Sequence, residues 1–186
     1  MAYLLKENLY SKVRSRFYSD FSVENAAKRT LNETVNAQKR YSTKKYDVFL
    51  SHSSKDASLI LGVKYELEEK GFSVYVDWID DSEIDRSKVT AENAAMLRDR
   101  MRNCNSLIYV YTKNATQSKW MPWELGYFDG YKGTVAILPV LDSKHETFKG
   151  VEFVGVYPVI ELSEYSNYFR VNEAYGRSPY LSDWIK

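Results

Sequence analysis

The sequence predicts an α/β protein built on a parallel sheet, and two observations support this class. From residue 46 onward, short apolar segments typical of strands alternate with longer amphipathic segments typical of helices. The segment Ser106–Tyr111 is largely apolar without alternation, as expected for a strand that helices cover on both faces. With 186 residues, 44% of them hydrophobic, the chain is long enough to bury one substantial core.

Residues 1–45 predict a helical extension in front of this sheet. They contain neither proline nor glycine, and apolar residues recur every fourth position from Leu5 to Phe17, as on one face of a helix. A second helix is expected from about Ser22 toward Arg40. The two helices either brace the globular part or serve in oligomerisation or sensing. Since most amphipathic stripes face a core, we favour the brace.

The helices and strands of the globular part, 46–186, are predicted from apolar segments and from the residues that end them. Strands are expected at 46–51, 72–76, 107–111, 134–140 and about 156–160. Helices are expected at 54–70, from Ser87 or Thr90 to Asn103, and around Pro122, which suits a first helical turn. Gly71 stops the first of these helices. The aromatic-rich tail after residue 160 predicts a closing helix and a packed terminus.

Charge and cysteine content limit the partners and the compartment. The formal net charge is only +1, although residues 1–45 hold ten of the 26 Lys and Arg residues and four of the 25 Asp and Glu residues. No aromatic–basic reader motif accompanies this basic arm, so we expect no nucleic-acid partner. The N-terminus offers no signal or membrane segment. A lone Cys104, far from His52 and His145, favours a cytoplasmic protein without a metal site.

Polar residues follow three of the predicted strands, where an open parallel sheet binds its ligands. The first strand continues into the hydroxyl-rich segment Ser51–Asp56, and the second ends in Asp77. The third leads to Ser118–Gly126, which places Glu124 among tryptophans just inside a helix start. Hydroxyls and backbone N–H groups at a helix start suit a ribose or a pyrophosphate. A helix cap would need only one of these serines.

These three segments, in this order, resemble a TIR (Toll/interleukin-1 receptor) domain, specifically the bacterial type found in anti-phage defence systems such as Thoeris. The resemblance covers about residues 46–161. It implies a flavodoxin-like parallel five-stranded sheet with strand order 2-1-3-4-5, whereas the residues alone predict only the alternation. It also implies self-association through TIR contacts, with the adenine end of NAD+ held by a second protomer, and a separate effector that senses the product.

The resemblance implies an NAD+ nucleosidase that cleaves the nicotinamide–ribose bond and forms an ADP-ribose-derived signal, cyclic or conjugated, with NAD+ as substrate and no cofactor. The nicotinamide of NAD+ is a cation that leaves without a proton, so one carboxylate suffices where O-glycosidases need two. Glu124 matches the family's catalytic glutamate in a Ser-x-Trp-x-x-x-Glu-Leu pattern. There it can stabilise positive charge on the ribose or take the sugar as an ester.

The resemblance also suggests residues that hold NAD+. Trp120, four residues before Glu124, matches a ring that contacts the nicotinamide–ribose end. The acidic loop from Asp77 to Lys88 corresponds to the family's BB loop, and its spacing lacks the Gly and Glu of an EF-hand. Trp123, which points away from Glu124, is expected in the core. The expected binding residues are Ser51, His52, Ser53, Asp77, Trp78 and Trp120.

Two other functions stay open. In a non-catalytic TIR assembly module, Glu124 would only complement a helix dipole on a solvated face, and Trp120 would only pack. In an enzyme similar to nucleoside deoxyribosyltransferases, the same glutamate would act on a nucleoside rather than on a dinucleotide. The presence of both Glu124 and Trp120 favours the NAD+ nucleosidase, because an assembly module needs neither residue.

Overall fold

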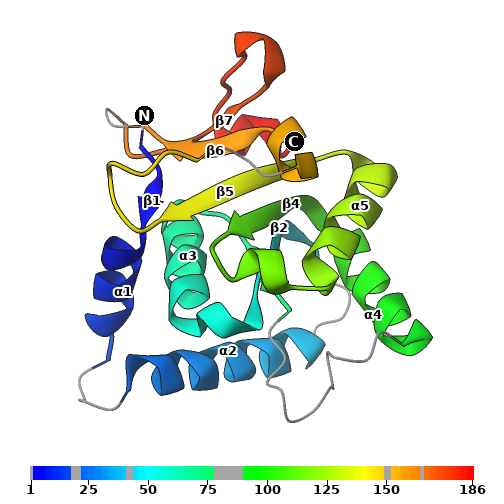
Figure 1. Ribbon diagram of the computed structural model, residues 1–186. Helices are drawn as coiled ribbons and strands as arrows, with labels where there is room; N and C mark the ends of the chain where they lie inside the picture. Colours follow the sequence, from blue (N-terminus) through cyan, green and yellow to red (C-terminus); the bar gives the residue numbers. More distant parts are fainter. Residues whose placement is uncertain (1, 18–21, 41–43, 78–89, 149–151, 164–165) are drawn as a thin grey trace.

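The computed structural model describes residues 2–17, 22–40, 44–77, 90–148, 152–163 and 166–186. Its centre is a seven-stranded sheet with the order β3-β2-β4-β5-β6-β7, in which β1 also pairs with β5 (Figure 1). The strands are β1 (Leu4–Leu5), β2 (Tyr46–Ser51), β3 (Val74–Val76), β4 (Cys104–Tyr111), β5 (Val135–Leu141), β6 (Val159–Leu162) and β7 (Phe169–Asn172). The α-helices are α1 (Lys6–Arg14), α2 (Val23–Arg40), α3 (Ala57–Glu69), α4 (Ala91–Arg102), α5 (Trp120–Lys132) and α6 (Leu181–Trp184). Two 3-10 turns concern the site: η1 (Ser54–Asp56) and η2 (Ala115–Gln117).

The predicted strand order is confirmed. The five strands β3-β2-β4-β5-β6 are parallel to their neighbours in the flavodoxin-like order. Two further strands join the sheet, since β1 runs parallel to β5 and β7 runs antiparallel to β6. The tail after residue 160 therefore supplies a strand that the sequence analysis did not predict, as well as the expected closing helix, α6.

The boundaries of the elements agree with the prediction in most places. Strand β2 and helix α2 match closely, and the helix predicted at 54–70 consists of η1 followed by α3. Gly71 follows that helix with a φ of +88°, the left-handed conformation of a glycine stop. Helix α4 begins directly after Thr90, whereas Ser87 lies outside the described residues. Strand β6 begins later than predicted because Glu152–Val156 forms a 3-10 turn.

The N-terminus is built into the sheet. Strand β1 pairs with the last two residues of β5, and the backbone of Ala2 exchanges two hydrogen bonds with Leu162 at the end of β6. Strands β5 and β6 pair at Ile137 and Val159, nearer their beginnings, so β1 lies between their later parts (Figure 1). The helical stripe predicted from Leu5 to Phe17 is confirmed only for Leu9 and Val13, because Leu5 pairs with β5 and α1 spans Lys6–Arg14.

Helices cover both faces of the sheet. Helices α1, α2, α3 and α6 share one apolar cluster with one face, while α4 and α5 share a second cluster with the other face (Figure 1). Leu9, Val13, Ala27 and Leu31 of the two N-terminal helices are fully buried in the first cluster. These helices pack as a brace, while the domain boundary at residue 45 stays a prediction. No helix among the described residues has the length and apolarity needed to cross a membrane.

A close approach of two helices fixes the position of α1. A Cβ atom placed on Gly62 of α3 would lie 2.9 Å from the Cβ of Leu9 and 3.1 Å from its carbonyl oxygen. These distances are shorter than van der Waals contact, and the backbone of α1 cannot rotate away as a flexible side chain would. Gly62 is therefore the residue that lets α1 pack directly on α3.

We predict that Gly62→Ala lowers the midpoint of thermal unfolding, because α1 must move off α3 to admit the methyl group. Overpacking of this kind costs about 1–3 kcal/mol. The matched control is Gly130→Ala in α5, where a Cβ would meet nothing within 4 Å. That variant should gain about 0.5–1 kcal/mol from helix propensity. Equal midpoints for the two variants, measured by circular dichroism, would contradict this account.

Candidate active site

The candidate site lies beyond the carboxyl ends of β2 and β4, on the face of the sheet that α5 covers. Ser51 ends β2 and is the register partner of Tyr109 in β4, so the two side chains lie on the same face. The hydroxyl of Ser51 donates a hydrogen bond of 2.5 Å to Oε2 of Glu124 in α5. This contact joins residues 73 positions apart and fixes the start of α5 over the end of β2.

Glu124 is buried rather than solvated. It is the fifth residue of α5, and its side chain is 3% exposed. An acid that merely complemented a helix dipole would lie in the first turn on an exposed face, so the interpretation of Glu124 as such an acid on a solvated face is wrong. Burial, together with the neighbouring Tyr111 and Glu124, raises the pKa of Tyr109 to about 12. Like an ordinary tyrosine, Tyr109 is neutral at physiological pH, so it places no second negative charge near Glu124.

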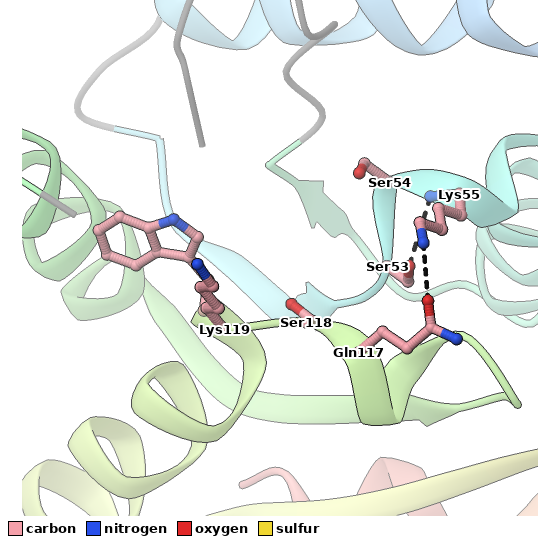
Figure 2. Close-up of a pocket in the computed structure, with 7 residues that line it drawn as sticks. Ser53, Ser54, Lys55, Gln117, Ser118 and Lys119 are labelled. Carbon is pink, nitrogen blue, oxygen red and sulfur yellow. Dashed lines mark hydrogen bonds between the residues drawn. The ribbon is translucent and has the colours of Figure 1, made fainter. Parts of the chain in front are cut away.

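A pocket of about 300 Å³ opens where the segment after β2 faces the segment after β4. Figure 2 shows the two walls, with Lys55 reaching across to Gln117. That hydrogen bond is 2.7 Å long, and Ser53 accepts a second one from the backbone N–H of Lys55. The pocket is lined by Ser53, Ser54, Lys55, Gln117, Ser118, Lys119 and Trp120.

The lining combines two ammonium groups, three hydroxyls and one aromatic ring. Lys55 and Lys119 are exposed, so their charges are available at the mouth of the pocket. Trp120 is 5% exposed and its ring meets that of Trp123 edge-on, with centroids 5.6 Å apart. Such a set of groups suits a ligand that carries phosphate, hydroxyl groups and a flat ring. Glu124 itself does not line the pocket and follows Trp120 by one helical turn.

The structure brings four of the predicted residues together. Ser53 and Trp120 line the pocket. Ser51, two residues before Ser53, and Glu124, four residues after Trp120, are hydrogen-bonded to each other. His52 is 3% exposed and does not line the pocket. Its Nδ1 lies 2.7 Å from the carbonyl oxygen of Leu50, which can only accept, so Nδ1 carries a proton.

Asp77 lies away from the pocket, and Trp78 is not among the described residues. Asp77 is 2% exposed and forms an ion pair with Arg100 of α4, and it does not line the pocket. Trp78 and the rest of the acidic loop fall outside the described residues. Trp123, predicted in the core, packs against the apolar cluster beneath α5 but stays half-buried, with its ring stacked on Tyr127. The described residues contain no group of three His, Cys, Asp or Glu side chains that could hold a metal ion.

Of the seven residues that line the pocket, only Ser53 and Trp120 were among the expected binding residues. The other five, Ser54, Lys55, Gln117, Ser118 and Lys119, lie within three residues of Ser53 or Trp120 in the chain. Their signal was present, because an ammonium group beside a hydroxyl-rich helix start is what an anion site requires. Which lysines face the pocket depends on how the two segments are placed against each other, and this information is not local in the chain.

Comparison with known proteins adds independent findings. The family model of the TIR domain matches residues 48–169. The "Probable 3' cyclic ADP-D-ribose synthase ThsB'" of Bacillus cereus (strain MSX-D12) is 49% identical over 158 residues, which are 84% of this chain and 79% of that protein. The "Putative cyclic ADP-D-ribose synthase TIR2" of Cytobacillus dafuensis is 34% identical over 51% of this chain and 24% of that protein. The "Probable 2' cyclic ADP-D-ribose synthase TcpO" of Methanobrevibacter olleyae is 28% identical over 69% of this chain and 36% of that protein.

We predict that Ser51→Ala destabilises the fold, because it leaves the buried carboxyl group of Glu124 without this hydrogen bond. The loss of such a bond to a buried group costs about 1–3 kcal/mol. The free energy of unfolding is measured in urea. Ser11→Ala, on the exposed face of α1, is the control and should change it by less than about 0.5 kcal/mol. A Ser51→Ala variant as stable as this control would show that the Ser51–Glu124 contact does not stabilise the fold.

Proposed function

This chain belongs to the TIR domain family, and we propose that it is an NAD+ nucleosidase that produces a cyclic ADP-ribose signal in anti-phage defence. The observation that carries the proposal is the position of Glu124. Its side chain is buried, accepts a hydrogen bond from Ser51, and lies one helical turn from Trp120 in the pocket wall. The three relatives, each named as a cyclic ADP-D-ribose synthase, support the same reaction.

The chemistry requires one carboxylate. The bond between the nicotinamide nitrogen and the ribose breaks, and its electron pair neutralises the pyridinium ring. Positive charge then develops on the ribose, where the carboxylate of Glu124 stabilises it or captures the sugar as an ester. Water would complete hydrolysis and release a proton. An atom of the same ADP-ribose would complete cyclisation, and the names of the relatives support this second outcome.

The pocket supplies the binding energy. Lys55 and Lys119 pair with the pyrophosphate, the serine hydroxyls bond to phosphate or ribose, and the ring of Trp120 packs against the nicotinamide–ribose end. Because Glu124 is 3% exposed, the ribose reaches it only when the side chains above it move on binding. His52 holds the turn after β2 through its bond to the carbonyl of Leu50.

The other two functions fit the site less well. An assembly module has no need for a buried, hydrogen-bonded carboxylate beside a cationic pocket. A nucleoside substrate has no phosphate for Lys55 and Lys119 to pair with. The proposal includes two partners. The protein self-associates so that a second protomer holds the adenine end of NAD+, and a separate effector senses the product.

We predict that Glu124→Gln abolishes nicotinamide release from NAD+. The amide keeps an acceptor for Ser51 but carries no charge to stabilise the ribose cation, so the rate should fall about 10²–10⁴-fold. Mass spectrometry of concentrated protein incubated with NAD+ gives both the rate and the mass of the second product. A mass lower by one water than that of ADP-ribose identifies cyclisation.

The same experiment controls for misfolding of the variant and for the absence of an activating factor. The variant must unfold at the temperature of the wild type, and both proteins are tested with a crowding agent and with lysate of phage-infected cells. Turnover by wild type alone supports the enzyme. If neither protein turns over NAD+ under any of these conditions, the assembly module becomes the better description.

We predict that Lys119→Gln raises the KM for NAD+ with little change in kcat, because the ammonium group pairs with the pyrophosphate equally in the ground and transition states. The expected rise is about fivefold, the value of one charge-assisted contact of about 1 kcal/mol at an exposed site. The control is Lys144→Gln, a lysine that is exposed and does not line the pocket. Equal KM values for the two variants would remove Lys119 from the binding site.

A further inference from the structure

Asp56 occupies a helix-capping position without capping its helix. It is the residue before α3, where an Asp side chain commonly accepts a bond from a backbone N–H of the first turn. Its side chain makes no such bond, although Asp56 is only 6% exposed. A buried carboxylate is stable only with hydrogen-bond donors, so the partners of Asp56 must come from another part of the chain.

Those partners lie at the beginning of η2. The hydroxyl of Thr112 donates to Oδ2 of Asp56 over 2.6 Å, and Nδ2 of Asn114 donates to Oδ1 over 2.7 Å. Thr112 is 2% exposed, and its hydroxyl also accepts a bond from the backbone N–H of Ala115. Asn114 is the capping residue of η2, and its side chain likewise does not cap its own turn. Asp56 therefore holds the entry of η2 by two bonds.

The residues that make these two hydrogen bonds are close in sequence to the two segments that line the pocket. One wall consists of Ser53–Lys55, directly before Asp56, and the other consists of Gln117–Trp120, which begins at the last residue of η2. The bond between Lys55 and Gln117 also spans the two walls, but both residues are exposed and water weakens it. The bond of Asp56 to Thr112 is buried and its bond to Asn114 is partly buried, so together they are the stronger fixed connection between the walls on this side of the pocket.

We propose that Asp56 is a positioning residue that sets the separation of the two pocket walls and thereby the affinity for NAD+. This inference rests on the proposed function for its ligand, but the contacts that carry it are independent of that function. Asp56 does not line the pocket. Its loss should widen the pocket and weaken binding, while the Ser51–Glu124 bond keeps the catalytic carboxyl group in place.

The geometry allows a reciprocal exchange of residues as the test. In Asp56→Asn, the bonds from Thr112 and Asn114 lose the negative charge that strengthens them, and the amide of Asn114 must turn over to accept from the new amide nitrogen. In Asn114→Asp, two carboxylates oppose each other. The double variant Asp56→Asn/Asn114→Asp restores every bond, because the amide at 56 accepts from Thr112 and donates to the carboxylate at 114. Neither the net charge nor the composition of the double variant differs from that of the wild type.

We expect Asp56→Asn to raise the KM for NAD+ about tenfold, the value of one hydrogen bond to a charged group, with kcat within about threefold. The double variant should recover most of the wild-type KM. Amide hydrogen exchange of residues 112–119, measured without ligand, should become about tenfold faster in Asp56→Asn and return in the double variant. Gly62→Ala, destabilised at a distant contact, serves as the stability control and should leave the KM unchanged.

Three results would overturn the proposal: an unchanged KM in Asp56→Asn, a folded double variant that fails to recover, or a KM in Gly62→Ala that rises as much. If the wild type does not cleave NAD+, the proposed function fails, and hydrogen exchange alone decides the inference. Exchange that is the same in wild type and Asp56→Asn then refutes the role of Asp56 in placing the walls. Faster exchange that the double variant reverses supports that role without reference to any substrate.

Discussion

The burial of Glu124 is the constraint on which the rest of the site depends. A carboxyl group removed from water is unfavourable unless a donor replaces the water, and Ser51 is that donor. Ser51 can reach it only because the pairing of β2 with β4 points its side chain toward α5. Helix α5 in turn must begin directly after η2 to bring its second turn over the end of β2. The sheet register, the turn and the helix start thus form one arrangement around a single side chain.

Much of the fold could be predicted because its signals are local. The strand at 46–51 and the helix that ends at Gly71 are marked by apolar runs and a stop residue within the segment itself. Strand β1 could not be predicted, because Leu4 and Leu5 also fit a helical stripe and become a strand only by pairing with distant β5. Strand β7 did carry a local signal, since its sequence Phe-Arg-Val-Asn alternates apolar and polar residues, but the aromatic-rich tail around it favoured a helix.

Some residues of the site could likewise be predicted from local motifs, whereas others could not. Glu124, Trp120 and Ser53 could be identified from motifs, and the structure places the tryptophan and the serine in the pocket lining. Asp77 was expected to reach the ligand, yet it is buried in an ion pair with Arg100, a partner that no spacing in the sequence reveals. The contacts that shape the pocket were missed for the same reason. They join side chains such as Lys55 and Gln117, which come together only after the sheet has formed.

The separation of the pocket from the carboxyl group bears on the chemistry. Contacts to the pyrophosphate do not change as the glycosidic bond breaks, so by themselves they would lower KM without raising kcat. They raise kcat only if part of the binding energy drives the ribose past Trp120 to a carboxyl group that is 3% exposed. A site that opens only to the ribose also admits little water. Exclusion of water would favour attack on the ribose cation by an atom of the same ADP-ribose, and thus cyclisation over hydrolysis. Burial of Glu124 thus accounts both for the fixed architecture around it and for the cyclic product that we propose.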